Sequence, residues 1–77
     1  MATNKIILEM IKSLNQTAQI SEKTMLLGEG ILDSLGIMNL SIKINEQFHI
    51  EIDIFDITPE NFATVEDITN LVNRKLT

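Results

Sequence analysis

Ser34 is the side chain in this sequence with the clearest potential for chemistry. It lies in the run GILDSLG, residues 30–36, directly after a glycine-containing loop and directly before an amphipathic stretch. A serine at the junction of a loop and a helix is commonly a helix cap. The Ser34 hydroxyl is therefore either such a cap or the group through which the protein acts, and the rest of the sequence must separate the two.

Catalytic and metal-binding patterns are missing around Ser34. Asp33, Ser34 and His49 are the residue types of a hydrolytic triad, but there is no Gly-x-Ser-x-Gly elbow, and an adjacent Asp and Ser cannot orient a histidine between them. Asp53 and Asp56 with Glu51 could suggest a calcium site, but the spacing, the central glycine and the terminal glutamate of an EF-hand loop are missing, so we interpret them as solvated carboxylates. With no cysteine and one histidine, the sequence predicts neither a metal site nor an enzyme, and a small hydrolase is the weakest hypothesis.

Length and charge narrow the class of protein. The 77 residues predict one small domain, 1–77, with a single core and no room for a deep active site. Eleven acidic residues against six basic ones give a net charge of -5, which opposes nucleic-acid binding and favours partners with a basic surface. No apolar run reaches the ~18 residues of a membrane span, and the N-terminus does not resemble a signal peptide. Together with the lack of cysteine, these features predict a cytoplasmic protein.

Two segments before Ser34 must position it. Residues 3–15 have a candidate cap at Thr3 or Asn4 and apolar residues at helical spacing, which predicts an amphipathic helix: Ile7, Met10, Ile11 and Leu14. Residues 16–33 have no helical periodicity and contain Gly28 and Gly30, which predicts a long loop. The loop also holds apolar residues that water would not tolerate all exposed, so we expect it to pack onto the helices: Ile20, Met25, Leu27, Ile31 and Leu32.

The segment after Ser34 has two interpretations. Apolar and polar residues alternate within 38–44 and again within 50–54, as in a β-hairpin, which would give an α+β fold. Against this, residues 45–47 contain no glycine and no Asn-Gly or Asp-Gly pair. Asp33 or Ser34 also offers a helix cap at the front. The pattern alone leaves the helix and the hairpin open.

As a helix, residues 35–48 would carry two apolar stripes rather than one. The first supplies what the core of a helical bundle needs: Ile37, Leu40, Ile44 and Phe48. The second, which we call the outer stripe, lies on a roughly opposite face and begins beside Ser34: Leu35, Met38 and Ile42. The outer stripe is either buried under the long loop or exposed for a partner, and the sequence leaves these options nearly even.

Helix signals return near the end of the chain. Thr58 followed by Pro59 predicts a cap and the first position of a short helix. Thr64 and Asp67 resemble a capping box ahead of a last amphipathic helix with apolar residues at Ile68, Leu71, Val72 and Leu76. Three phenylalanines recur every seven residues, but the proline and the loops between them exclude a continuous heptad, so we interpret them as core aromatics: Phe48, Phe55 and Phe62.

These features follow the order and spacing of the acyl carrier protein family, which the chain resembles over essentially its whole length. The matching segments are GILDSL at 30–35, EQF at 46–48 and ATVEDI at 63–68. The resemblance implies an all-α fold: a small four-helix bundle of three longer helices and one short helix, with a long loop between helices one and two. It favours the helix for residues 35–48 and leaves 50–54 as a connector whose isoleucines line the core or an acyl pocket.

The resemblance also implies a role for Ser34. In the family, a phosphopantetheinyl transferase attaches a 4'-phosphopantetheine arm from coenzyme A to this serine. The acyl or aminoacyl cargo then rides as a thioester on the arm's thiol, which explains the missing cysteine. Asp33 would cap the helix and help to position Ser34, and the helix N-terminus suits the negative charge of a phosphodiester.

The resemblance further implies where partners meet the chain. Loading and accepting enzymes would dock on the helix after the serine, at Leu35, Met38, Asn39, Ile42 and Glu46. We expect a monomeric, non-catalytic carrier that acts in a biosynthetic pathway. The competing hypothesis is an unmodified helical adaptor that grips a partner through the outer stripe, with Ser34 as a cap.

Departures from the fatty-acid type of carrier point to a dedicated pathway. Several positions that are usually acidic along the docking helix are uncharged or basic here: Gly36, Asn39, Lys43 and Asn45. Glu46 is the only acid left within 35–48, so attraction to a basic synthase patch is weaker. The pattern favours an aminoacyl or peptidyl carrier, reminiscent of D-alanyl carrier proteins, or a specialised polyketide or acyl carrier.

Overall fold

A computed structural model describes residues 3–14 and 19–76. Helix α1 spans Thr3–Leu14, α2 Ser34–Phe48, α3 Pro59–Phe62 and α4 Val65–Leu76, and a 3-10 turn, η1, spans Ile54–Asp56. These two ranges contain no strand. The expected four-helix bundle with one short helix is confirmed. The β-hairpin alternative is wrong, because its first half lies within α2.

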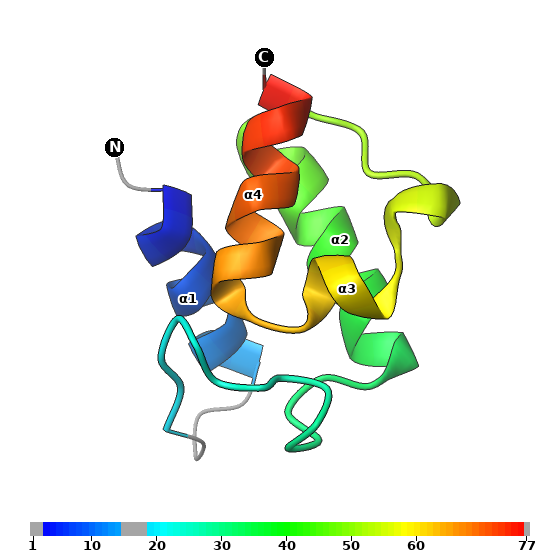
Figure 1. Ribbon diagram of the computed structural model, residues 1–77. Helices are drawn as coiled ribbons and strands as arrows, with labels where there is room; N and C mark the ends of the chain where they lie inside the picture. The colour runs from blue at the N-terminus through cyan, green and yellow to red at the C-terminus, as the bar shows by residue number, and fades with distance from the viewer. Residues whose placement is uncertain (1–2, 15–18, 77) are drawn as a thin grey trace.

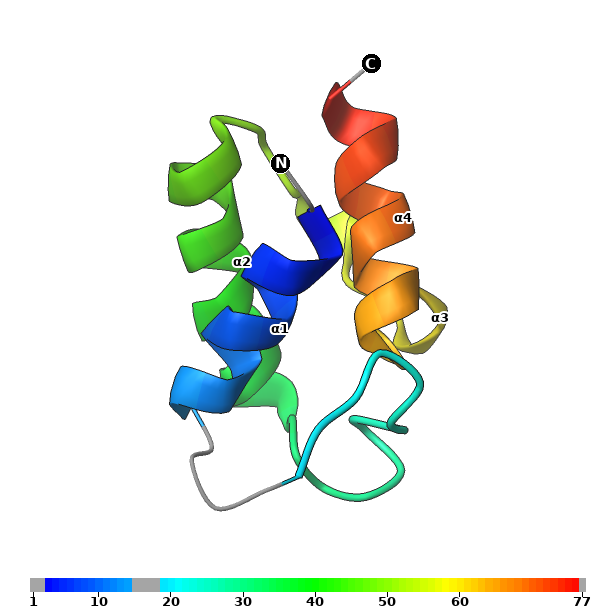
Figure 2. The ribbon, with the colours of Figure 1, turned by 90° about the vertical axis from the view of Figure 1, so that its left-hand side faces the viewer.

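The three longer helices enclose one apolar core. α1 packs against both α2 and α4, and α3 packs against α4. The loop 19–33 crosses the end of the bundle where α1 ends and α2 begins (Figures 1 and 2). Helices, loop and connector all contribute buried side chains: Ile7, Ile11, Ile20, Leu26, Leu32, Ile37, Leu40, Ile44, Ile52, Phe62, Val65, Ile68, Leu71 and Val72. Burial of these side chains is the main favourable term holding the bundle together.

Helix α1 begins at Thr3, which the sequence offered as a cap before the helix. Thr3 is already helical, so neither Thr3 nor Asn4 precedes the helix as the expected cap. The Asn4 side-chain amide instead donates a hydrogen bond to the Glu22 carboxylate in the loop. Leu14 is exposed at the end of the helix, whereas Ile7 and Ile11 are buried and Met10 is half-buried. Residue 15 of the predicted helix and residues 16–18 of the predicted loop lie outside the described residues.

The loop 19–33 packs onto the helices, as expected. Ile20, Leu26 and Leu32 are buried, and Leu27 and Ile31 pack against the core from its edge. The backbone N–H of Leu26 also donates to the carbonyl of Ala63 at 2.8 Å, which ties the loop to the turn before α4. Met25 is the exception among the apolar loop residues, because it is mostly exposed.

Helix α2 ends on a left-handed residue. His49 has φ 56° and ψ 46°, and its N–H donates to the carbonyl of Asn45, so His49 is an exposed residue that caps the helix. The core stripe faces inward, with Phe48 half-buried at its end. Ser41 is buried beside this stripe and donates to the carbonyl of Ile37 at 2.8 Å, so its hydroxyl is satisfied within the helix.

The connector after α2 departs most from the prediction. Ile52 is buried, but Ile54 is 77% exposed and Phe55 is 87% exposed. The interpretation of all three phenylalanines as core aromatics is therefore wrong for Phe55. Successive residues of a 3-10 turn point about 120° apart. Asp56 is the residue of η1 that faces α4, so the two apolar neighbours before it point away from the bundle.

The acidic residues of the connector hold its shape. The Asp53 carboxylate accepts hydrogen bonds from the N–H groups of Phe55 and Asp56 at 2.9 and 3.2 Å, and the Asp53 N–H donates to the Asp56 carboxylate at 3.1 Å. This arrangement is a capping box. Asp56 also pairs with the ammonium of Lys75 at 2.6 Å. Glu51 and Asp53 are exposed, as expected for solvated carboxylates, although Asp53 also caps η1. The interpretation is wrong for Asp56, which is half-buried and paired with Lys75.

The predicted N-terminal caps of the last two helices are confirmed for α3 and, in part, for α4. Thr58 caps α3 and Pro59 takes its first position. The Asp67 N–H donates to the Thr64 hydroxyl at 3.1 Å, as in a capping box. In a capping box the Asp67 carboxylate would accept from the backbone N–H of Thr64. Here it accepts from the Thr64 hydroxyl instead, at 2.9 Å. Leu76, at the end of α4, is exposed rather than part of the core.

Candidate functional site

The Ser34 hydroxyl is exposed at the first position of α2, and Asp33, not Ser34, is the cap. The Asp33 carboxylate accepts a hydrogen bond from the N–H of Gly36 at 2.7 Å. Within the described ranges the Ser34 side chain forms no hydrogen bond of its own. Asp33 is thus the cap of α2, and the hydroxyl without a hydrogen bond belongs to the next residue, Ser34.

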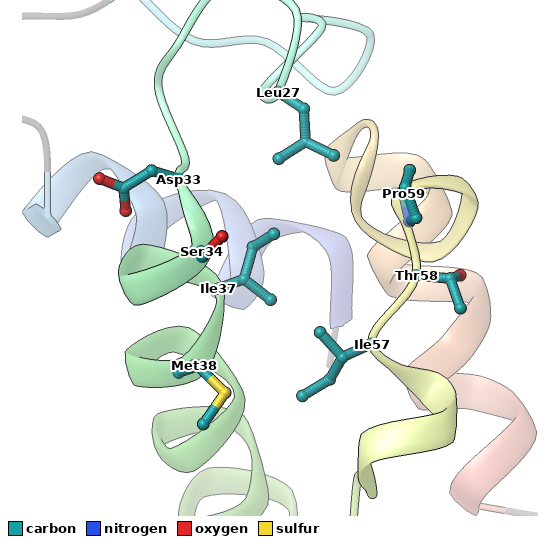
Figure 3. Close-up of a pocket in the computed structure, with 8 residues that line it drawn as sticks. All are labelled: Leu27, Asp33, Ser34, Ile37, Met38, Ile57, Thr58 and Pro59. Atoms are coloured by element: carbon teal, nitrogen blue, oxygen red, sulfur yellow. The ribbon is translucent and has the colours of Figure 1, made fainter.

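A hollow of about 490 Å³ opens beside Ser34. Leu27 from the loop, Ile37 and Met38 from α2, and Ile57, Thr58 and Pro59 before and at the start of α3 line it with the Asp33–Ser34 pair. Figure 3 shows the Ser34 hydroxyl on the side facing this hollow, whereas the Asp33 carboxylate points to the other side of the chain. A group attached to Ser34 would therefore lie next to a mainly apolar wall.

The far wall of this hollow is what sequence reasoning missed. Ile57, Thr58 and Pro59 are more than twenty positions beyond Ser34, and the sequence predicted Thr58 and Pro59 only as the start of a helix. Ile37 and Ile57 face each other across the opening in Figure 3. Only the packing of α3 against α4, together with the connector, brings this wall opposite the serine.

The N-terminus of α2 suits a negative charge on Ser34. Fifteen residues of helix begin at this serine, and the N–H groups of a first turn, together with the helix dipole, attract anions. The Asp33 carboxylate already occupies the N–H of Gly36. A phosphodiester at the Ser34 oxygen would therefore be stabilised by the helix dipole and by the other N–H groups of the first turn, which the site leaves for it.

The outer stripe is exposed, which settles the question that the sequence left open. Leu35 is 69%, Met38 53% and Ile42 56% exposed. The two polar residues predicted beside them, Asn39 and Glu46, are exposed as well. At about 100° per residue these five side chains share one side of α2, opposite the core stripe. A continuous face with apolar centre and polar edge therefore starts at Ser34 and runs along the helix.

The geometry also bears on two alternatives that the sequence disfavoured, a hydrolytic triad and a metal site. Ser34 and His49 flank opposite ends of α2, roughly 22 Å apart along a helix of this length, so they cannot share a proton. No cluster of three potential metal ligands occurs among the residues described. Likewise, none of the helices of residues 3–14 and 19–76 is long and apolar enough to cross a membrane.

One ion pair fixes the elements on the far side of the hollow. The Lys75 ammonium lowers the pKa of the Asp56 carboxyl, chiefly through their hydrogen bond, and the same bond raises the pKa of Lys75. The Asn61 side-chain amide also donates to the carbonyl of Asp56 at 2.8 Å. These contacts link η1 to α3 and α4 and so hold the wall opposite Ser34 in place.

The structure is thus a small helical bundle with an exposed hydroxyl at a helix N-terminus. The family pattern described as "Phosphopantetheine attachment site" matches residues 5–72 of the chain. The chain belongs to this family of phosphopantetheine-bearing carrier proteins. Members carry a covalently attached 4'-phosphopantetheine, interact with modifying and loading enzymes, and are generally non-catalytic.

Two individual proteins to which the chain is similar are D-alanyl carrier proteins. The chain is similar to the D-alanyl carrier protein of Listeria welshimeri, with 30% identity over 70 residues that cover 88% of this chain and 90% of the relative. The D-alanyl carrier protein of Listeria monocytogenes is similar with the same identity and coverage. The expected membership in the carrier family is thereby confirmed.

Proposed function

We propose that Ser34 is the residue that bears the 4'-phosphopantetheine arm and that the arm carries an aminoacyl group of the D-alanyl class as a thioester. The observation that carries this proposal is the exposed, unbonded hydroxyl at the start of α2. When bound, the arm supplies the thiol that this cysteine-free chain lacks. The aminoacyl cargo is supported by the similarity to the Listeria D-alanyl carrier proteins.

The chain's own residues have positioning roles in this proposal. The Ser34 oxygen forms a bond to the phosphorus of coenzyme A that bears the pantetheine, the pyrophosphate bond breaks, adenosine 3',5'-bisphosphate leaves, and the serine proton passes to the transferase or to water. Asp33 keeps the first turn of α2 closed through Gly36, so the hydroxyl is held outward. The apolar wall formed by Leu27 and Ile57 gives the attached group a surface to rest on.

The outer stripe would be the main contact for partner enzymes. Leu35, Met38 and Ile42 expose apolar surface next to the attachment point, and Asn39 and Glu46 form its polar edge. Exposed apolar side chains framed by polar ones are typical of protein interfaces. We propose a monomeric cytoplasmic carrier whose partners are a phosphopantetheinyl transferase and the enzymes that load and unload the arm.

Intact mass spectrometry tests the attachment. The purified chain is incubated with coenzyme A and a promiscuous phosphopantetheinyl transferase, and it should gain the mass of one phosphopantetheinyl group. Ser34→Ala should abolish the gain. Ser13→Ala is the matched control, because Ser13 is an exposed helical serine on α1 whose loss should leave the gain intact. No gain with several transferases, or a gain that persists in Ser34→Ala, would overturn the assignment.

The unmodified adaptor is the second candidate, favoured by the exposure of the outer stripe alone. An adaptor would bind its partner equally well before and after treatment with the transferase. It would also tolerate Ser34→Ala. Partner binding or transfer that requires the arm excludes this candidate, and a lack of turnover of activated esters disposes of the hydrolase hypothesis.

A further inference from the structure

Met38 lies where three surfaces meet. It belongs to the outer stripe, and it lines both the hollow beside Ser34 and a smaller hollow of about 220 Å³ between α2 and residues 52–57. Ser34 is one turn before it on α2, and side chains four positions apart on a helix have Cβ atoms about 6 Å apart. In Figure 3 the Met38 sulfur lies on the side of α2 that faces Ile57, the same side as the Ser34 hydroxyl. A change of polarity at Met38 therefore acts on all three surfaces at once.

The Met38 thioether is accessible to small oxidants, because the side chain is 53% exposed. The chain contains no cysteine, tryptophan or tyrosine, so the methionines are its most readily oxidised side chains before the arm is attached. Methionine sulfoxide is a stable product that a dedicated class of reductases returns to the thioether. The chemistry at Met38 is therefore reversible.

A hydroperoxide converts a thioether to a sulfoxide in one two-electron step. The sulfur lone pair forms a bond to the outer peroxide oxygen, the O–O bond breaks, and the proton of the outer oxygen passes to the departing oxygen, which leaves as water when the oxidant is hydrogen peroxide. The sulfur is oxidised and the peroxide is reduced. In the return step the sulfoxide oxygen leaves as water while two thiols of the reductase become a disulfide.

A sulfoxide at Met38 places a strong hydrogen-bond acceptor in apolar surroundings. The neighbouring side chains on the outer stripe and in the two hollows are apolar: Leu35, Ile37, Ile42, Ile54 and Ile57. Water bound to the sulfoxide oxygen must be removed before a partner covers this surface, and a polar group buried without a hydrogen bond costs free energy. In the free chain the oxygen stays in water, because Met38 is mostly exposed. Oxidation therefore weakens docking without unfolding the bundle.

Met25 offers a comparison within the same chain. It is also 53% exposed, but it lies in the loop 19–33 and is not among the described residues that line either hollow. Met10 is half-buried on α1. Exposure is therefore equal at Met25 and Met38, whereas only Met38 lies beside the attachment point.

We propose that Met38 is a reversible oxidation site that regulates transfer at Ser34. The thioether form docks partner enzymes. The sulfoxide form, made by a hydroperoxide, weakens that contact until a methionine sulfoxide reductase restores the thioether. This inference rests on the proposed carrier function, because the polarity of the outer stripe matters only if partners reach Ser34 across it.

Peptide mass spectrometry tests whether Met38 is oxidised. The unarmed chain is treated with dilute hydrogen peroxide, which catalase then removes, and the protein is cleaved after glutamate. This cleavage places the four methionines on separate peptides, residues 1–9, 10–22, 23–29 and 30–46. We expect 30–46, which holds Met38, and 23–29, which holds Met25, to gain one oxygen atom well before 10–22. A peptide 30–46 that stays unoxidised while 23–29 is oxidised would overturn the inference.

Arming kinetics test the consequence for transfer. The rate at which a phosphopantetheinyl transferase attaches the arm is measured for each protein before and after peroxide. For wild type we expect the KM for the chain to rise about tenfold with kcat little changed, as for loss of a central interface contact. Met38→Leu stays apolar and of similar volume but has no sulfur, so peroxide should not change its KM. Met25→Leu is the matched control, and its KM should rise on oxidation as much as that of wild type.

Reversibility and folding are checked on the same samples. Treating oxidised wild type with two methionine sulfoxide reductases, one for each epimer, should return KM to its starting value. The thermal melt of the oxidised chain should match that of the untreated chain. The inference is overturned by a KM that peroxide does not change, that rises equally in Met38→Leu, or that the reductases do not restore. A melt that shows the oxidised chain to be unfolded overturns it as well.

Two outcomes distinguish this inference from the proposed function. A chain that gains no arm before peroxide contradicts the proposed function itself. A chain that is armed equally well before and after Met38 is oxidised contradicts only the oxidation site.

Discussion

The Asp33 carboxylate accepts the N–H of Gly36 at 2.7 Å, and this one bond separates the two roles that a serine at a helix start normally combines. Because Asp33 satisfies the first turn of α2, Ser34 is not needed as a cap. Its hydroxyl is left exposed over the hollow that Leu27 and Ile57 line. The proposed attachment point thus lies at a helix end without being needed as its cap.

Substitutions at Asp33 and Ser34 should therefore affect stability very differently. Asp33→Ala should lower the free energy of unfolding by about 1 kcal/mol, because the N–H of Gly36 loses its acceptor, whereas Asp33→Asn keeps an acceptor and should cost less. Ser34→Ala should leave stability unchanged. Urea unfolding followed by circular dichroism measures all three. A loss for Ser34→Ala as large as that for Asp33→Ala would return the capping role to Ser34.

Substitutions in the core stripe and in the outer stripe of α2 should change the free energy of unfolding by different amounts. Leu40 is fully buried, so Leu40→Ala should cost about 2–5 kcal/mol of unfolding free energy. Met38→Ala and Ile42→Asp should cost much less, because both side chains are mostly exposed, yet both should slow loading of the armed protein. A stability loss for Met38→Ala comparable with that for Leu40→Ala would place Met38 in the core instead.

His49 ends α2 in a conformation that glycine adopts more easily. At φ 56° a residue with a Cβ is strained by roughly 1–2 kcal/mol, which glycine avoids. We expect His49→Gly to raise the midpoint of urea unfolding, since the N–H bond to Asn45 does not depend on the side chain. His49→Ala is the control and should bring no such gain. Equal midpoints for the glycine and alanine variants would contradict the strain at this φ, and midpoints of both variants below that of wild type would show that the His49 side chain supports the helix end.

The ion pair between Asp56 and Lys75 should make stability depend on pH. The pKa of Asp56 is lowered in the folded protein, so its contribution is present above the ordinary pKa of an aspartate, about 4, and is lost as the pH falls through the lowered pKa. The raised pKa of Lys75 preserves the pair until strongly alkaline pH.

Comparing wild type with Lys75→Gln isolates this effect. The variant should melt at a lower temperature at neutral pH, and the difference in Tm should shrink as the solution is acidified below the pKa of Asp56. The pair is partly exposed, so the difference should be small and should decrease with salt. A constant Tm difference at every pH would mean that Lys75 stabilises α4 through its aliphatic chain rather than its charge.

The sequence by itself determined the start signals of α2 and α3 and the candidate serine. A cap at Asp33 or Ser34 and the proline at the start of α3 are local signals, readable because capping depends only on residues a few positions apart. The periodicity of α2 also revealed two apolar stripes. Periodicity alone did not distinguish a helix from a hairpin in 38–54, because β-like alternation and a two-stripe helix place apolar residues at overlapping positions.

Tertiary structure decided which apolar surfaces are covered. The outer stripe is exposed because the loop 19–33 buries Leu26 and Leu32 at the end of the bundle and leaves the outer side of α2 bare. Phe55 points outward because Asp56 is turned to Lys75, a residue nearly twenty positions later. The wall opposite Ser34 likewise comes from a distant segment. Burial depends on contacts between segments remote in the chain, and local patterns do not encode which of those contacts form.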